Sequence, residues 1–225
     1  MKTIKPITLL MTDLETTGVD PEVTEILEMA SVAINFDGLK MKPIDHFHEY
    51  IFTKTKPNIK DEFVMKYQQG LYKKCNELNP ALNLENAQNK FKAFVNKHYP
   101  NQNLTDINSL PQFTGQNFSA FDAHYLVKNN FLKKGYKDEN GKMYSHYNYR
   151  SLELQSFSIA FSTMLGFKSS TEFIKYIASL DTETVLPEGS AHTALYDCYN
   201  QIKFYNGMMI FLKAHEIQSN FLKEQ

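Results

Sequence analysis

The chain has 225 residues, of which 42% are hydrophobic and 13% are aromatic, so it can bury a sizeable core and is not a disordered chain. Its formal net charge of −1 argues against a protein that binds nucleic acid tightly and non-specifically through many phosphate contacts, but not against an enzyme that binds one end of a strand through metals. Two cysteines, Cys75 and Cys198, form neither a disulfide framework nor a metal-binding spacing. No apolar run reaches the length of a membrane span and the N-terminus lacks a signal-peptide pattern, so we expect a cytoplasmic protein.

The apolar patterns, taken in chain order, predict one domain, residues 1–225, in which an early sheet precedes helices that alternate with short strands. Strands are predicted at 7–15, 26–35, 44–52, 112–115 and 149–152. Helices are predicted within 54–79, at 84–99 and at 119–133. After the strand at 149–152, helical structure is predicted through residue 165, then at 170–180 and at 192–215. This order indicates a mixed α/β sheet with helices packed on it, a helical insertion at about 54–100 and a polar excursion at about 135–147.

Two acids, Asp13 and Glu15, close the first predicted strand, and Gly18 breaks the run that follows. Successive side chains on a strand point to opposite faces, so the two acids share a face with Leu9 and Met11. Neighbouring carboxylates at the end of a buried strand repel each other and lose hydration. A bound Mg²⁺ or Mn²⁺ would offset this cost because both ions prefer oxygen ligands. The alternative is a strand that runs out into solvent with two exposed acids.

A further acid, Asp122, follows a short predicted strand. Gly115 marks the exit of that strand, Asn117 can cap the next helix, and Asp122 then falls in its first turns. The alternative for Asp122 is a solvated aspartate that is stabilised by the helix dipole.

His192 precedes Asp197 by five residues, which is about 140° around a helix, so the two would not share a face in mid-helix. They converge if His192 lies on the loop or in the first turn, which Pro187 and Gly189 favour. A histidine whose pKa is near neutrality can act as a general base. The alternative for His192 is a capping or core histidine.

Taken in order, Asp13-x-Glu15, Asn117-x4-Asp122 and His192-x4-Asp197 resemble the three motifs of the DEDDh 3′→5′ exonuclease superfamily, over residues 7 to about 205. The resemblance implies a ribonuclease H-like α/β fold, with a mixed five-stranded sheet flanked by helices. It also implies phosphodiester hydrolysis at the 3′ end of a single strand, with release of nucleoside 5′-monophosphates. Asp13, Glu15, Asp122 and Asp197 would hold two Mg²⁺ or Mn²⁺ ions, and His192 would be the general base.

Within that superfamily the chain is most similar to the oligoribonuclease family, which implies short single-stranded RNA as the substrate. Gly18-Val19-Asp20-Pro21 follows the first motif as it does in that family, and Tyr149-Arg150-Ser151-Leu152-Glu153 is similar to its Tyr-Arg-Asn-Leu-Asp segment. Arg150 is the only arginine of the chain and can grip a phosphate with two parallel hydrogen bonds. The alternative for Arg150 is a structural salt bridge to Glu153 or another acid.

The resemblance also implies which residues receive the strand. The substrate-binding positions expected from it are Leu14, Thr16, Thr17, Gly18, Val19, Asn117, Phe118, Tyr149 and Arg150. Phe118 stands where oligoribonucleases have serine, which is closer to RNase T and the proofreading exonucleases. Val19 and Phe118 would pack on the last bases, since base–aromatic stacking contributes about 1–3 kcal/mol per base. The alternatives are a DNA-directed exonuclease and a catalytically silent scaffold, and both a monomer and a homodimer stay open.

Overall fold

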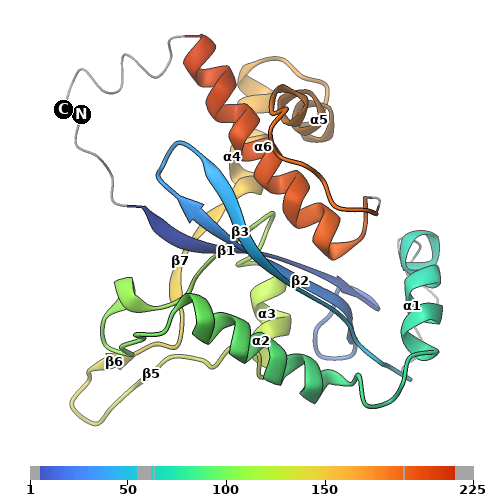
Figure 1. Ribbon diagram of the computed structural model, residues 1–225, viewed down its shortest axis with the longest axis vertical. Helices are drawn as coiled ribbons and strands as arrows, with labels where there is room; N and C mark the ends of the chain where they lie inside the picture. Colours follow the sequence, from blue (N-terminus) through green and yellow to red (C-terminus); the bar gives the residue numbers. More distant parts are fainter. Residues whose placement is uncertain (1–5, 55–61, 63, 190, 216–225) are drawn as a thin grey trace.

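Five strands build one mixed sheet in the computed structural model, which describes residues 6–54, 62, 64–189 and 191–215 (Figure 1). The strands, in the sheet order β3-β2-β1-β4-β7, are β3 (Met41–Tyr50), β2 (Ile26–Phe36), β1 (Ile7–Thr16), β4 (Gln112–Gly115) and β7 (Asn148–Glu153). β1, β2 and β3 form an antiparallel meander, whereas β4 pairs in parallel with both β1 and β7. The predicted mixed five-stranded sheet is confirmed, and β1 lies in its middle.

Helices cover both faces of this sheet (Figure 1). They are α1 (Gln69–Asn76), α2 (Leu84–His98), α3 (Asp122–Lys128), α4 (Leu154–Met164), α5 (Ser170–Leu180) and α6 (Ala194–Ala214), with the short helices η1 (Val64–Gln68) and η2 (Ile107–Ser109). α4, α5 and α6 pack on one face, and α2 and α3 pack on the other. In the part of the chain that the structure describes, no helix is both long and apolar enough to span a membrane.

The two faces of the sheet have separate apolar cores, and β1 contributes to them alternately. Leu9 and Met11 pack toward α4, α5 and α6, whereas Leu10 and Leu14 pack toward α2 and α3. This alternation follows from the two-residue period of a strand, and each such buried side chain contributes about 1.5–3 kcal/mol. Asp13 therefore continues the row of Leu9 and Met11 and faces α6, as predicted.

One predicted helix is shorter than expected. The helix predicted at 119–133 is reduced to α3, because Phe121 before it has non-helical angles (φ −127°, ψ −74°) and Asn130 after it has a left-handed φ of 56°. A left-handed residue cannot continue a right-handed helix. Phe121, rather than the predicted Asn117, is the N-cap residue of α3.

The expected division of the chain stays a prediction: a single exonuclease domain of residues 1–225 with an insertion at about 54–100. Within that insertion the structure has η1, α1 and α2. Within the excursion predicted at about 135–147 it has a small hairpin of β5 (Tyr136–Lys137) and β6 (Met143–Tyr144).

Asn206 fixes the rotation of α6 against the sheet. Its Oδ1 accepts from the backbone N–H of Met41 at 2.8 Å, and its Nδ2 donates to the Met41 carbonyl at 3.0 Å. The next residue, Gly207, lets α6 approach α5 closely, since a Cβ there would lie 1.9 Å from the carbonyl oxygen of Ile177. These contacts place the first turns of α6 over the end of β1.

Gly207→Ala should lower the free energy of unfolding by about 1–3 kcal/mol, because the added methyl meets backbone of α5 that cannot yield. The melting temperature should then fall by about 2–4 °C for each kcal/mol. Gly70→Ala in α1 is the matched control, since a Cβ there meets nothing within 4 Å and alanine favours a helix. Thermal unfolding measures both, and equal melting temperatures for the two variants would contradict the tight α5–α6 contact.

Candidate active site

Three carboxylates meet where β1 ends and α6 begins. Asp13 and Glu15 come from β1, Asp197 comes from the first turn of α6, and one oxygen of each lies within 4.8 Å of the others. Glu15 is 7% exposed, whereas Asp13 and Asp197 are half-buried. Oxygen ligands at this spacing suit a hard divalent cation.

Asp122 is the fourth predicted acid, and it lies beside this group. It is the first residue of α3 and is 3% exposed. Its charge is the largest cause, after burial, of the raised pKa of Asp13, although its carboxylate is not within the group of three. Backbone hydrogen bonds from Asp122 itself and from Leu14 offset part of the cost of burying it. All four predicted acids therefore converge at one end of the sheet.

Burial and repulsion raise the pKa of all four acids. The pKa values of Asp13 and Asp122 lie well above the ordinary range, that of Glu15 is about 8, and that of Asp197 is also raised. Desolvation is the largest cause at every position, and neighbouring carboxylates add to it. Such a set becomes fully ionised near neutral pH only if positive charge enters it. The donor atoms therefore fit a divalent cation.

His192 lies in the loop before α6, where its φ is 68°. Its backbone N–H donates to Oδ2 of Asp197 at 2.9 Å, so the loop brings the two residues together, as predicted. Its imidazole packs against Tyr67, with ring centroids 4.4 Å apart and an interplanar angle of 42°. His192 as a whole is an exposed residue.

Gln68 contacts the site and was not expected from the sequence. It is the last residue of η1 and is 2% exposed, and its Nε2 donates to Oε2 of Glu15. Its neighbour Tyr67 is the residue that packs on His192. No signal in the sequence distinguishes this glutamine, because a polar residue in an amphipathic helix normally faces solvent.

Glu28 is a fifth carboxylate near the site. It lies opposite Glu15 in the β1–β2 register and is fully buried, and its charge raises the pKa of Asp13, Glu15 and Asp197. Its Oε1 lies 2.6 Å from Nε2 of His48, while its Oε2 has no hydrogen-bond partner among the described residues. The signal for Glu28 in the sequence was a single acid within an apolar strand, since an unpaired buried charge is costly.

The turn after β1 is closed by its own hydrogen bonds. The Thr16 hydroxyl donates to the Gly18 carbonyl at 2.5 Å, and the Thr17 hydroxyl accepts a backbone N–H at 2.9 Å. Both threonines and Leu14 are buried, whereas Val19 is 70% exposed. Of the side chains predicted here as substrate contacts, only Val19 is therefore open to a ligand.

Phe118 is not available to a base, which corrects the expectation that it packs on the substrate. It is 2% exposed, and its ring stacks on Phe113 with centroids 5.2 Å apart and an interplanar angle of 6°. The physical reason is the left-handed turn at Asn117, after which the next side chain enters the core beside α3. Asn117 itself is exposed.

Arg150 lies on the edge strand β7, with β4 between it and β1, so it is two strands away from Asp13. It is exposed, its backbone N–H donates to Asn148 at 3.0 Å, and its carbonyl accepts from Gln112 at 2.9 Å. Arg150 therefore lies on a different element of the fold from each of the four predicted acids. The predicted contact from the side chain of Tyr149 lies outside the part of the chain that is described.

Comparison with protein families matches residues 10–205 to the RNase_T family model, which describes an exonuclease. No curated protein matches the chain. The matched range contains all three motifs, and therefore every predicted metal ligand and His192.

Solved structures share the fold. Cell-death related nuclease 4 (CRN-4) is 16% identical with a TM-score of 0.58, and the match covers 91% of this chain and 64% of that one. Exonuclease I of E. coli, in complex with a dT13 oligonucleotide, is 13% identical with a TM-score of 0.57 and coverages of 96% and 43%. A 3′-exonuclease that recognises a histone mRNA stem-loop is 13% identical, with a TM-score of 0.51 and coverages of 92% and 65%. The chain spans less than two thirds of each of these proteins, and the likeness confirms the predicted ribonuclease H-like fold.

The raised pKa values predict that the metal-free protein loses stability as the pH rises from about 5 to about 8. The folded state keeps a proton on Glu15 up to a pKa of about 8, whereas the unfolded chain releases it near the ordinary value of 4.5. Folding is therefore favoured at low pH, and this advantage is lost as the pH rises through the folded pKa. We expect the melting temperature in EDTA to fall over this range, and a divalent cation to raise it most at the upper end.

Glu15→Gln provides the control for this pH dependence, because glutamine does not titrate. The variant should show a flatter fall in melting temperature and should melt above the wild type in EDTA at about pH 8. Glu139→Gln, at an exposed glutamate between β5 and β6, should behave as the wild type. Parallel curves for the wild type and Glu15→Gln would contradict the raised pKa of Glu15.

Proposed function

The chain belongs to the RNase_T exonuclease family, and on that premise we propose that it hydrolyses single-stranded nucleic acid from the 3′ end and releases nucleoside 5′-monophosphates. The observation that carries this proposal is the group formed by Asp13, Glu15 and Asp197, whose oxygens lie within 4.8 Å of one another. Asp122 and His192 adjoin it, so the five residues that the chemistry needs stand at one end of the sheet.

The four acids Asp13, Glu15, Asp122 and Asp197 would hold two divalent cations, Mg²⁺ or Mn²⁺, since their donors are all oxygens and their burial demands positive charge. Bound cations supply Lewis-acid stabilisation of the charge that develops on the phosphodiester. The acids themselves must first lose their protons, so the site should become competent as the pH rises toward 8.

His192 would act as the general base. The residue is exposed, its imidazole packs against the ring of Tyr67, and its backbone N–H donates to Asp197. A neutral imidazole nitrogen there accepts a proton from the attacking water, and such a group contributes about 10²–10⁴-fold to a rate.

The 3′ end would enter along the turn that follows β1. Val19 projects from that turn and is 70% exposed, so it can pack on the last base, and the backbone of Thr16, Thr17 and Gly18 lies beneath it. The side chain of Val19 cannot form a base-specific hydrogen bond, which suits an enzyme that cleaves without regard to base sequence.

Short single-stranded RNA is the substrate that we propose, on the similarity of Tyr149 and Arg150 to the oligoribonuclease segment. The alternative is a DNA-directed exonuclease, which is supported by the likeness to E. coli exonuclease I bound to dT13. Arg150 lies two strands from its own acids, so a homodimer in which it reaches the partner's site would fit its place on the edge strand β7.

The experiment that tests the proposal compares matched RNA and DNA oligomers labelled at the 5′ end, with Mg²⁺, Mn²⁺ or EDTA. A ladder that shortens from the 3′ end only in the presence of a cation supports the exonuclease, and faster loss of short RNA supports the oligoribonuclease assignment. Cleavage that persists in EDTA would contradict it.

Asp197→Asn should lower the rate more than about 100-fold. Loss of a residue that only hydrogen-bonds to a metal ligand lowers metal affinity or activity by about 10–100-fold, and loss of a ligand itself should cost more. The fold should stay intact, since asparagine removes the cost of burying a charge, which is the main cause of the raised pKa of Asp197, and also the repulsion from Glu28. Asp106→Asn, in the loop before η2, is the matched control because asparagine caps as well as aspartate does. Normal turnover by Asp197→Asn would exclude Asp197 from the site.

His192→Gln should keep the stabilisation by Mn²⁺ and still lose about 10²–10⁴-fold in rate at neutral pH. His46→Gln, at an exposed histidine on β3, should retain the wild-type rate. Steady-state kinetics together with the Mn²⁺-induced shift in melting temperature separate the two effects. An unchanged rate for His192→Gln would exclude His192 as the base.

A further inference from the structure

Two glutamine amides approach the carboxylate group from opposite elements. Gln201 lies on α6 one turn after Asp197, and its Nε2 donates to Oδ1 of Asp13 at 3.2 Å. Gln68, at the end of η1, donates in the same way from its Nε2 to Oε2 of Glu15. Both glutamines are buried, with 6% and 2% of their surface exposed.

The two amides share a second property. The Oε1 atoms of Gln68 and Gln201 are both buried and have no hydrogen-bond partner among the described residues. A buried acceptor without a donor costs free energy, whereas an apolar side chain of the same shape would avoid that cost. Rotating either amide by 180° would point its oxygen at a carboxylate oxygen. That contact is less favourable than the present one, in which the amide N–H donates to the carboxylate. The contact with the acid therefore decides the orientation of each amide.

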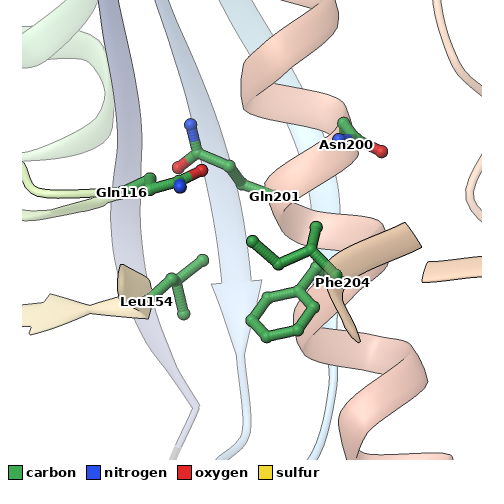
Figure 2. A pocket seen from close by; sticks show the side chains of 6 residues that line it. Gln116, Leu154, Asn200, Gln201 and Phe204 are labelled. Atoms are coloured by element: carbon green, nitrogen blue, oxygen red, sulfur yellow. The ribbon is translucent and has the colours of Figure 1, made fainter. Parts of the chain in front are cut away.

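The surroundings of Gln201 leave its amide little freedom. Gly115, at the end of β4, lies against it, since a Cβ there would be 3.8 Å from Oε1 of Gln201 and 2.9 Å from the Thr12 carbonyl. Beside the amide is a small cavity lined by Gln116, Leu154, Ile174, Asn200, Gln201 and Phe204. Figure 2 shows the amides of Gln116 and Gln201 at one end of this cavity and Leu154 and Phe204 at the other.

The cavity is the right size for one water molecule. The space open to the centre of a water measures about 10 Å³, close to the minimum that holds one.

We propose that Gln201, together with Gln68, is a positioning residue that holds a site carboxylate in the orientation needed to bind a divalent cation. Asp13 is repelled by four acids, Asp122, Glu15, Asp197 and Glu28, and the amide of Gln201 holds its Oδ1 by a hydrogen bond. A lysine could hold it, but a cation at that position would compete with the metal. A neutral amide positions the carboxylate and leaves its charge for the metal.

This inference rests on the proposed metal site but not on cleavage of nucleic acid. The probe is Mn²⁺ alone, which is titrated into the full chain by calorimetry at one pH, with the melting temperature of each metal-free variant as the check on folding. Gln201→Met keeps the length of the side chain and removes the amide. It should bind Mn²⁺ about tenfold more weakly, melt no lower than the wild type, and lose kcat with little change in KM.

Gln116→Met is the matched control, since Gln116 lines the same cavity but donates to Gln155 rather than to an acid. It should bind Mn²⁺ within about twofold of the wild type, whereas Gln68→Met should weaken binding as Gln201→Met does. If Gln201→Met does not fold, Gln201→Asn, one methylene too short to reach Asp13, makes the same comparison.

Wild-type Mn²⁺ affinity in folded Gln201→Met would overturn the proposal, and so would an equal loss in Gln116→Met, because the effect would then come from the cavity. A wild type that binds Mn²⁺ and cleaves no nucleic acid would refute the proposed function, while the difference between Gln201→Met and Gln116→Met would still support the positioning role.

Discussion

The burial of mutually repelling carboxylates at the end of β1 is the constraint on which the rest of the site depends. Asp13, Glu15, Asp122 and Asp197 all have a raised pKa, and the buried Glu28 adds to the repulsion from the neighbouring strand. Desolvation is the largest cause of these raised pKa values, so different neighbouring side chains would not remove most of the cost of ionising the acids. Positive charge from outside the chain removes the cost of ionising these acids. That requirement is the physical link between the fold and a metal-dependent reaction.

The fold keeps these acids together because the elements that carry them cannot move apart. β1 lies in the middle of the sheet, between β2 and β4, and its side-chain alternation aims Asp13 at α6. α6 is fixed by the two hydrogen bonds of Asn206 to Met41 and by the contact of Gly207 with α5. A small shift of α6 would relieve the repulsion among the carboxylates at the end of β1. The packing of α6 far from the site prevents that shift.

The parts of the site that follow from local rules could be predicted from the sequence. The period of a strand puts Asp13 in the row of Leu9 and Met11, and a loop before the last helix lets His192 reach Asp197. Glu28, Gln68 and Gln201 depend instead on the cross-strand register and on how η1 and α6 dock, which no local pattern encodes. Phe118 was misjudged for the same reason, since its burial against Phe113 depends on the left-handed turn at Asn117.

The charge of the chain bears on how such a site can meet a polyanion. The net charge is −1 and five acids gather at the end of β1, so these acids repel a phosphate backbone once they are ionised. Arg150, the only arginine of the chain, lies on β7, two strands from β1. If the proposed function holds, a bound cation offsets this repulsion. The neutral amides of Gln68 and Gln201 leave the charge of Glu15 and Asp13 to the cation.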